Sequence, residues 1–458
     1  MGKAEQISRF AVKLTYSDLG PDTIHQVKRR VIDSFATSFG AFPSVPATIV
    51  RKIASLGTCK QGGATIIGTK AKVTPDMAAF ANSTMIRYLD YNDTYLSLEP
   101  AHPSDNIGAT LAAAEARGTT SKDFILGTVI AYEVQCRLCD AASLRPKGWD
   151  HVTYGPFSAA AGAGKIYGLT EEQMTNALGL AGVCNNAMRQ TRLGEISMWK
   201  ACAFANSSRG AILAVELASE GFTGPPEIFE GKMGFINQIS GPMKELEFSP
   251  GGGKPFMLDG TYIKYYNAEY HAQSAIGAAL ALRKEVGPKN IRGNVESILI
   301  ETHGPAYQII GCEPAKWRPQ AKETADHSLP YITACALMDG KITVASFIPE
   351  RFTDPALLDL TAKVKCVEDA EYSARYPDGF GNRITVKLKN GTTNVAEELY
   401  PKGHPRNPMT DAEIEEKFHT LASPVMPKKR RKDLLALCWR LDELDDLSAL
   451  LAATRCHV

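Results

Sequence analysis

Long apolar runs and an excess of one charge are both missing from this sequence of 458 residues. No stretch reaches the roughly eighteen consecutive apolar residues that a membrane-spanning helix requires. The opening M-G-K-A-E-Q-I-S has neither an apolar secretory core nor a Ser or Thr where N-myristoylation needs one. Lysine and arginine total 51 against 50 acidic residues, whereas nucleic-acid-binding proteins usually carry a basic excess. We therefore expect a cytoplasmic protein, or one of an equivalent reducing compartment, that binds neither membrane nor nucleic acid.

The motifs of metal, nucleotide and serine-hydrolase chemistry are missing as well. The single C-x-x-C, Cys136 to Cys139, has no second pair at metal-ligand spacing, and the ten scattered cysteines predict free buried thiols rather than disulfides. The glycines of 156–168 imitate a dinucleotide loop, but no strand precedes them and no ribose-binding acid follows, so these small residues predict two closely packed helices. Residues 249–257 lack the pattern of a phosphate loop, and no Gly-x-Ser-x-Gly elbow is present.

The order of apolar patterns indicates two domains, as the chain length also does. Helical spacing dominates the first half, strand signals appear only after about residue 295, and helical patterns return from residue 411. We expect the last helices to pack back on the first ones. The predicted fold is therefore mainly α, with a discontinuous helical domain from residues 1–265 and 400–458 and an inserted, smaller α+β domain from residues 266–399.

Individual elements follow from the same patterns and from start and stop signals. Helices are expected at 21–40 with Gly40 as the stop, 75–89, 106–117, 121–139, 201–220, 268–284, from 411 and over 433–453. Strands are expected at 295–302, 342–347, 362–366, 383–389 and 392–397. Asn390-Gly391 predicts a hairpin with a type I′ turn. The basic cluster 428–432 resembles a nuclear signal or an anion site, but a solvated loop before the last helix is the preferred interpretation.

Residues 87–105, R-Y-L-D-Y-N-D-T-Y-L-S-L-E-P-A-H-P-S-D, are the strongest candidate for a functional segment. Pro100 and Pro103 prevent a helix from continuing through it. Polar, titratable loops held between apolar helices often carry catalytic groups, although a solvated interhelical loop is the alternative. Asp93, Tyr95 and Glu99 are expected to support this loop or to face solvent.

Two histidines and two lysines supply further candidates. His102 lies between two prolines and His151 lies in G-W-D-H-V-T-Y-G-P, and imidazole is the side chain best suited to proton transfer near neutrality. Each is otherwise a structural histidine. Lys200 stands at a helix start and Lys264 stands among tyrosines, where each either binds a substrate carboxylate or phosphate or merely extends to solvent. A smaller set in the mixed domain could cap a helix or line a cleft: His303, Tyr307, Asp326 and His327.

Several motifs, in order, resemble the MmgE/PrpD family. They are D-Y-N-D-T-Y with H-P-S-D, H-V-T-Y-G-P-F-S-A-A-A-G-A-G-K, S-M-W-K-A-C-A-F-A-N, G-F-T-G-P and F-E-G-K-M-G-F. The resemblance runs from about residue 5 to about residue 450. That family includes 2-methylcitrate dehydratases, cis-aconitate decarboxylases and an iminodisuccinate epimerase.

The resemblance implies the same two-domain fold, a homodimer, and a site in the cleft between the domains that uses no metal, iron–sulfur cluster or organic cofactor. By matching motifs, it implies catalytic roles for Asp90, His102, His151, Lys200 and Lys264. It also implies substrate-binding roles for Thr94, Tyr154 and Tyr307.

Within the family, the sequence is most similar to the dehydratase branch, because Asn92 and Cys202-Ala203 replace the second acid and the Leu-His typical of decarboxylases. The expected reaction is proton removal beside a carboxylate of a small polycarboxylate such as 2-methylcitrate, followed by loss of water. The two lysines would hold carboxylates and the two histidines would act as acid and base, in an order left open. A decarboxylase, an epimerase and an inactive polycarboxylate-binding dimer are the alternatives.

Overall fold

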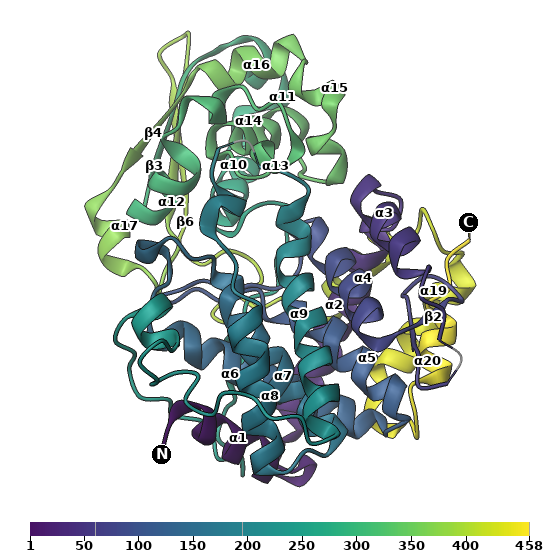
Figure 1. Ribbon diagram of the computed structural model, residues 1–458. Coiled ribbons are helices and arrows are strands. Elements are labelled where there is room, and N and C mark those ends of the chain that lie inside the picture. Colours follow the sequence, from purple (N-terminus) through teal and green to yellow (C-terminus); the bar gives the residue numbers. More distant parts are fainter. Residues whose placement is uncertain (60, 195, 458) are drawn as a thin grey trace. The chain divides into compact units, whose positions relative to one another are not determined.

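The computed structural model describes residues 1–59, 61–194 and 196–457, which form two compact units (Figure 1). Unit 1 contains Met1–Gly194, Met198–Thr261 and Thr410–Val458, so both ends of the chain contribute to it. Unit 2 is formed mainly by Tyr262–Met409. The predicted fold class is confirmed: the protein is mainly α-helical with a smaller α+β part.

Unit 1 is a bundle of helices with one short two-stranded ribbon. Its helices are α1 (Lys3–Lys13), α2 (Pro21–Ala41), α3 (Val45–Ala54), α4 (Pro75–Tyr88), α5 (Ile107–Arg117), α6 (Ser121–Ala141), α7 (Gly155–Tyr167), α8 (Glu171–Cys184), α9 (Trp199–Ser219), α18 (Asp411–Ala422), α19 (Lys428–Trp439) and α20 (Ser448–Ala453). The ribbon pairs β1 (Ala64–Thr65) with β2 (Lys72–Val73). Helix α7 is the centre of the bundle, because it packs against α6 and α9 and is buried on all sides except at Lys165 and Tyr167.

The small residues of α7 do allow a close helix contact, as the sequence predicted. A Cβ atom on Gly162 would lie 2.5 Å from the carbonyl oxygen of Gly127 in α6, and one on Gly127 would lie 2.8 Å from the carbonyl oxygen of Gly162. Two backbones therefore touch where neither helix has room for a methyl group. The glycines of this segment serve packing.

Gly162→Ala is expected to reduce the free energy of unfolding by about 1–3 kcal/mol, because the added methyl group forces α6 and α7 apart in a packed core. Chemical denaturation measures the effect. Gly260→Ala is the matched control, since no atom lies within 4 Å of a Cβ there and its φ is not positive. Equal stability of the two variants would contradict the close contact.

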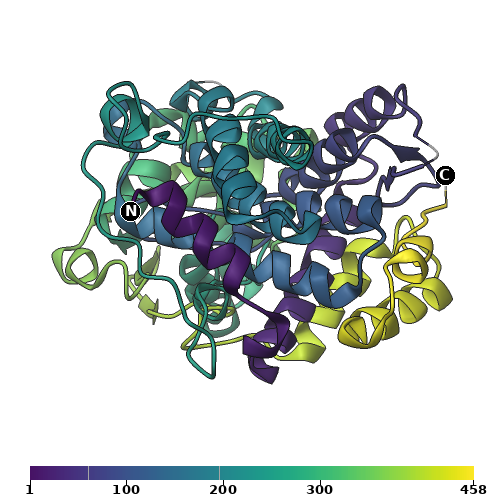
Figure 2. The ribbon, with the colours of Figure 1, turned by 60° about the horizontal axis from the view of Figure 1, so that its bottom comes forward.

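The C-terminal helices belong to the same bundle as the N-terminal ones. Helix α18 packs along α2, and α19 contacts α2 as well. Figure 2 shows the yellow C-terminal helices beside the purple and blue N-terminal part, with α1 crossing the front of the unit. A buried ion pair joins the two chain ends, because Lys417 Nζ lies 2.6 Å from Asp33 Oδ1.

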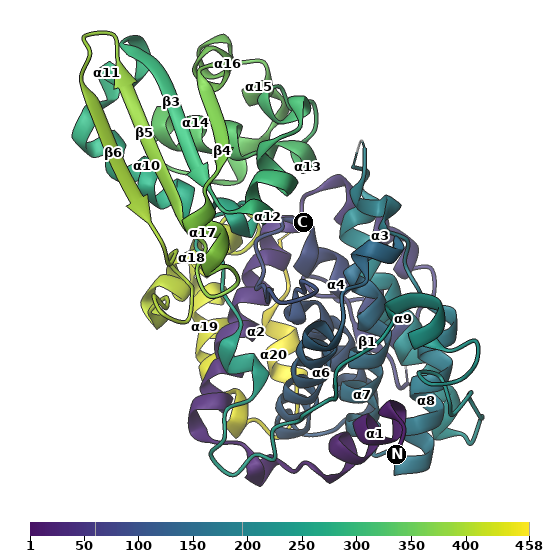
Figure 3. The ribbon, with the colours of Figure 1, turned by 90° about the vertical axis from the view of Figure 1, so that its left-hand side faces the viewer.

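Unit 2 is a four-stranded sheet with helices packed on it (Figure 3). The strands β3 (Val295–Thr302), β4 (Val364–Glu368), β5 (Asn382–Leu388) and β6 (Thr393–Glu398) lie in the order β4-β3-β5-β6. β3 runs parallel to β4 and antiparallel to β5, and β5 runs antiparallel to β6. Helix α10 (Gln273–Val286) packs on β5 and β6, and α14 (Leu329–Asp339) packs on β4. The remaining helices are short: α11 (Pro288–Gly293), α12 (Gly304–Ala306), α13 (Lys322–Ala325), α15 (Pro349–Phe352), α16 (Pro355–Ala362) and α17 (Ala370–Arg375).

Two strand-related predictions were wrong in part. Residues 342–347 form no strand but end in a 3-10 turn, Val344–Phe347. The Thr343 N–H donates to the Ser346 hydroxyl, and the Ser346 N–H donates to the Thr343 carbonyl. The hairpin at Asn390-Gly391 is confirmed, but its turn is not type I′. Gly391 has φ +87° while Asn390 has no positive φ, and the Asn390 side chain instead accepts the Thr392 N–H.

Several helix limits also differ from the prediction. The helix expected over 433–453 is interrupted, because α19 ends at Trp439, a 3-10 turn covers Leu441–Glu443, and α20 begins at Ser448. Gly40 does not stop α2, which continues to Ala41. The missing side chain at Gly40 instead lets Leu89 and Leu421 pack against the helix. The basic cluster 428–432 is not a loop but forms the first turns of α19, with Arg430 donating to the Arg455 carbonyl and Arg431 donating to the His419 carbonyl.

Candidate active site in unit 1

The loop after α4 begins with an unusual backbone turn at Asp90. Its φ of +52° is the one positive φ outside glycine in the described parts of the chain. The left-handed region is costly for residues with a side chain, and aspartate is among those that tolerate it best. The turn is closed by a hydrogen bond from the Asp90 N–H to the Arg87 carbonyl, 3.0 Å long. Tyr95 and Ala101 then exchange two backbone hydrogen bonds, which return the chain to His102.

The Asp90 carboxylate holds two buried cations. Arg87 NH1 lies 2.8 Å from one oxygen and Lys200 Nζ, from the start of α9, lies 2.9 Å from the other. Arg87 also lies 3.8 Å from Asp105, a fully buried acid. Burial raises the pKa of Asp105 to about 8 although Arg87 opposes the shift, so this carboxyl is mainly neutral at neutral pH. Two cations therefore lie within 2.9 Å of the one Asp90 carboxylate.

His102 is held by its Nδ1 atom. That atom lies 2.8 Å from the Asp93 carbonyl oxygen, which only accepts, so Nδ1 carries the proton. The Thr94 hydroxyl lies 3.2 Å from the same nitrogen. Nε2 lies 3.0 Å from Arg87 NH2, which only donates, and Nε2 therefore offers its lone pair to the guanidinium. His102 is thus a neutral Nδ1–H imidazole whose Nε2 is engaged by Arg87.

His151 has the same tautomer with a different partner. Its Nδ1 lies 3.0 Å from Asp150 Oδ1, and its buried Nε2 has no hydrogen-bond partner within the described chain. Burial lowers the pKa of His151 to about 3, with Asp150 opposing and Arg192, Arg87 and Arg145 adding to the shift. The imidazole is therefore neutral at neutral pH and keeps a lone pair on Nε2.

The two histidine rings pack edge to face. Their centroids are 5.8 Å apart and their planes are inclined by 61°. The two predicted histidines thus lie side by side, next to the Arg87–Asp90–Lys200 cluster that contacts His102. They differ in one respect that bears on chemistry, because Arg87 occupies Nε2 of His102 while Nε2 of His151 is unoccupied.

Comparison with known proteins places this arrangement in a family. The chain matches the model of the MmgE/PrpD N-terminal domain over residues 5–247 and that of the MmgE/PrpD C-terminal domain over residues 266–441. The chain belongs to the MmgE/PrpD family.

Relatives within the family cover most of the chain. It is 28% identical to a 2-methylcitrate dehydratase from Cupriavidus necator over 94% of this chain and 91% of that protein. It is 32% identical to a mitochondrial 2-methylcitrate dehydratase from Yarrowia lipolytica over 79% of this chain and 71% of that protein. It is 25% identical to a cis-aconitate decarboxylase-like protein from Aspergillus oryzae over 98% of this chain and 96% of that protein.

Five of the predicted site residues lie together in unit 1: Asp90, Thr94, His102, His151 and Lys200. Tyr154 does not donate to this group, because its fully buried hydroxyl donates to the Ala142 carbonyl at 2.9 Å. Burial raises the pKa of Tyr154 well above the normal range. It packs against Phe235 and therefore has a structural position.

Lys264 and Tyr307 belong to unit 2. Lys264 is only 1% exposed, and Tyr307 is half-buried at the start of a π-helical turn, Tyr307–Gly311, that packs against the core of that unit. Two other residues considered there, Asp326 and His327, form a carboxylate–imidazole pair at 2.6 Å, and Lys322 reaches the other Asp326 oxygen.

The sequence prediction missed the charged partners that set the state of the histidines. Arg87 stands inside the predicted segment, and Asp150 directly precedes His151, so both had a weak positional signal. Arg192, which binds Asp150, had none. Asp93 and Glu99 were correctly expected to support the loop: Asp93 accepts from Ser104 and Tyr132, and Glu99 accepts the Leu144 N–H.

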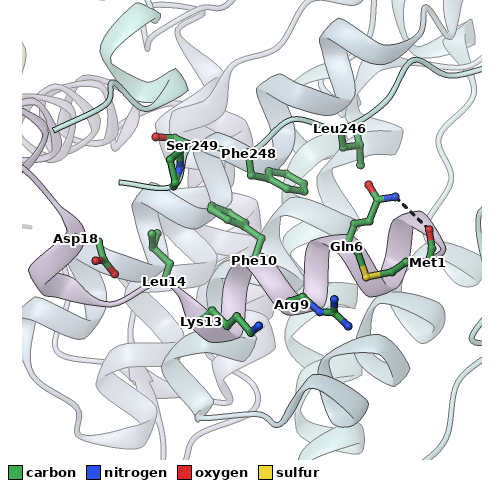
Figure 4. Close-up of a pocket in the computed structure, with 11 residues that line it drawn as sticks. Met1, Gln6, Arg9, Phe10, Lys13, Leu14, Asp18, Leu246, Phe248 and Ser249 are labelled. Carbon is green, nitrogen blue, oxygen red and sulfur yellow. Dashed lines mark hydrogen bonds between the residues drawn. The ribbon is translucent and has the colours of Figure 1, made fainter. Parts of the chain in front are cut away.

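Outside this cluster, the described residues include one surface cavity and ten cysteines, and neither involves a predicted site residue. A surface cavity of about 420 Å³ lies between α1 and residues 246–250, with stacked Phe10 and Phe248 on its wall, and contains none of the predicted site residues (Figure 4). Among the described residues, no His, Cys, Asp or Glu cluster has the geometry of a metal site, and no helix is both long and apolar enough to cross a membrane. All ten cysteines are free, and six of them are buried: Cys136, Cys139, Cys202, Cys335, Cys366 and Cys438.

Proposed function

We propose that the protein is a hydro-lyase that removes water from a small polycarboxylate such as 2-methylcitrate, without a metal or organic cofactor. One observation carries the proposal: two neutral histidines pack edge to face beside a buried cluster in which Arg87 and Lys200 both contact the Asp90 carboxylate. Proton removal beside a carboxylate requires both a base and cations for the charge that develops. The names of the relatives agree with this reaction class.

We assign the base to His151. Its Nε2 has a lone pair and no partner in the described chain, whereas that of His102 accepts from Arg87. In the proposed step, Nε2 of His151 takes the proton from the carbon beside a carboxylate, and the C–H electron pair moves into that carboxylate to give an aci-carboxylate. Lys200 and Arg87 stabilise the added negative charge. A bound substrate carboxylate also raises the pKa of His151 from its low value, because it favours the imidazolium.

His102 is assigned to the leaving group. The C–O bond breaks with both electrons on oxygen. His102, which is neutral in this structure, first takes a proton from solvent at Nε2 and gives this proton to the departing hydroxide, which leaves as water. Arg87 donates a hydrogen bond to Nε2 in this structure. The step therefore requires Arg87 to donate that hydrogen bond to a substrate carboxylate instead. Asp90 orients Arg87 and Lys200, and Thr94 hydrogen-bonds His102.

We retain three proposals that rest on the family motifs alone. Lys264 and Tyr307 of unit 2 contribute substrate contacts, the protein is a homodimer, and it acts in the cytoplasm. Light scattering measures the oligomeric state, and activity that persists after exhaustive chelation tests the proposed independence from metals.

A decarboxylase is the second candidate, because the Aspergillus oryzae relative aligns with nearly the whole chain. It would use the same cations on cis-aconitate but break a carbon–carbon bond. The two reactions give different products from different substrates, so one experiment separates them.

Incubation of the purified protein with 2-methylcitrate, citrate, cis-aconitate or iminodisuccinate, followed by product NMR, tests the proposal. We expect 2-methylcitrate to lose water and give the unsaturated tricarboxylate. Release of carbon dioxide from cis-aconitate would identify a decarboxylase, and inversion of iminodisuccinate would identify an epimerase. Saturable binding without turnover would identify an inactive binding protein.

A further inference from the structure

Asp150 is the buried carboxylate next to His151. It precedes the 3-10 turn His151–Tyr154, and its Oδ1 accepts the Val152 N–H at 3.1 Å. Arg192 approaches it from the 3-10 turn Arg189–Arg192, with Nε 2.8 Å from Oδ2 and NH2 3.4 Å from Oδ1. The Asp150 side chain is fully buried and that of Arg192 is 14% exposed. The Val152 N–H and the Arg192 guanidinium therefore both donate to this carboxylate.

This surrounding keeps Asp150 ionised. Burial alone would raise its pKa, but Arg192, His151 and the Val152 N–H outweigh burial and hold the pKa of Asp150 below the normal range. An ionised carboxylate only accepts hydrogen bonds. The His151 nitrogen that faces Oδ1 must therefore carry a proton, and in a neutral imidazole the other nitrogen, Nε2, then has none.

We infer that Asp150, clamped by Arg192, is a positioning residue that fixes the Nδ1–H tautomer of His151 and so keeps Nε2 available as a proton acceptor. The tautomer follows from the contact with an ionised Asp150, whereas its catalytic value rests on the proposed function. Asp150 touches no reacting atom in this scheme. It acts through the imidazole.

The substitution Asp150→Asn separates geometry from charge. The amide keeps the size of the carboxylate but has one acceptor oxygen and one donor nitrogen. Arg192 is the charged donor and binds the oxygen most strongly. The amide N–H₂ then takes the place of Oδ1, where it gives up the hydrogen bond from the Val152 N–H and faces His151 Nδ1, which becomes the acceptor. The proton moves to Nε2, and the lone pair needed for proton abstraction is lost.

The test measures the His151 tautomer by ¹⁵N NMR of histidine-labelled protein, with His151→Gln used to assign its signals. Wild-type protein is expected to show Nδ1–H, and D150N is expected to show Nε2–H. D150N should also lower kcat by on the order of 10²-fold with little change in KM, since losing general-base catalysis costs that much. An Nε2–H tautomer in the wild type would overturn the inference whether or not D150N folds, and so would an unchanged tautomer in D150N.

Glu133→Gln is the matched control. Glu133 is also a fully buried carboxylate with an arginine, since Arg137 Nε lies 2.9 Å from it, and it accepts the Ser249 and Met257 N–H groups. E133Q should be less stable than the wild type. Its His151 signals and its kcat should be unchanged. If no substrate of the panel is turned over, the proposed reaction fails while the NMR result still decides the role of Asp150. An equal tautomer change in E133Q would show that general destabilisation, and not Asp150, is responsible.

Discussion

His151→Gln is expected to lower kcat by about 10³-fold while the protein remains folded, because the variant keeps a polar side chain but loses the one unoccupied imidazole nitrogen of the pair. His102 cannot replace it in this geometry, since its Nε2 accepts from Arg87. Stopped or continuous assays with the substrate identified by the panel measure kcat. Circular dichroism and thermal unfolding confirm that the fold is retained.

His25→Gln is the control for this substitution. His25 also pairs with a carboxylate, with Nε2 3.0 Å from Asp411 Oδ2, but it lies half-exposed on α2 in a pair unrelated to the cluster around Asp90. We expect H25Q to keep wild-type kcat. A His151→Gln variant with more than a tenth of wild-type turnover would remove His151 from the base role and leave His102 as the candidate.

The parts of the fold that follow from local patterns were predictable. A Thr-Pro start predicts the helix at Pro75, and a short run rich in Val and Ile predicts the strand Val295–Thr302, because these signals act within a few residues. The segment 342–347 has an apolar content typical of a strand. Its Thr343 N–H nevertheless donates to the Ser346 hydroxyl within a 3-10 turn rather than to a neighbouring strand. Composition alone cannot show which set of hydrogen bonds is the more stable.

The site was predictable as a set of residues but not as a chemical state. Asp90, His102 and Lys200 are recognisable by type and motif. The turn at Asp90 that brings the carboxylate to Lys200 depends on one positive φ, and the lone pair of His151 depends on Arg192, which is 42 residues from Asp150 in sequence. Likewise, the neutral state of Asp105 arises from burial that no short motif encodes. Protonation is a property of the packed structure.

Lys417→Met is expected to reduce the free energy of unfolding by about 3–5 kcal/mol, the usual cost of leaving one member of a buried ion pair alone. Lys417 and Asp33 are almost fully buried, with 4% and 1% of their side chains exposed. Lys417 also donates to the Tyr91 carbonyl at 2.7 Å, so the variant removes a hydrogen bond from the loop that begins at Asp90. Chemical denaturation of the purified protein measures the loss.

Two further variants separate the cost of the unpaired charge from the loss of packing. Burial raises the pKa of Asp33 while Lys417 opposes it, so without the lysine Asp33 protonates and the penalty should grow as the pH rises. Adding Asp33→Leu to Lys417→Met should recover much of the stability, since it removes the orphaned carboxylate. Lys363→Met breaks an exposed pair with Asp359 and should cost less than about 1 kcal/mol. If Lys417→Met cost no more than Lys363→Met, burial would not govern the strength of this pair, and the attachment of α18 to α2 would have to rest on its apolar contacts and on the pairs of Asp411 with His25 and Arg29.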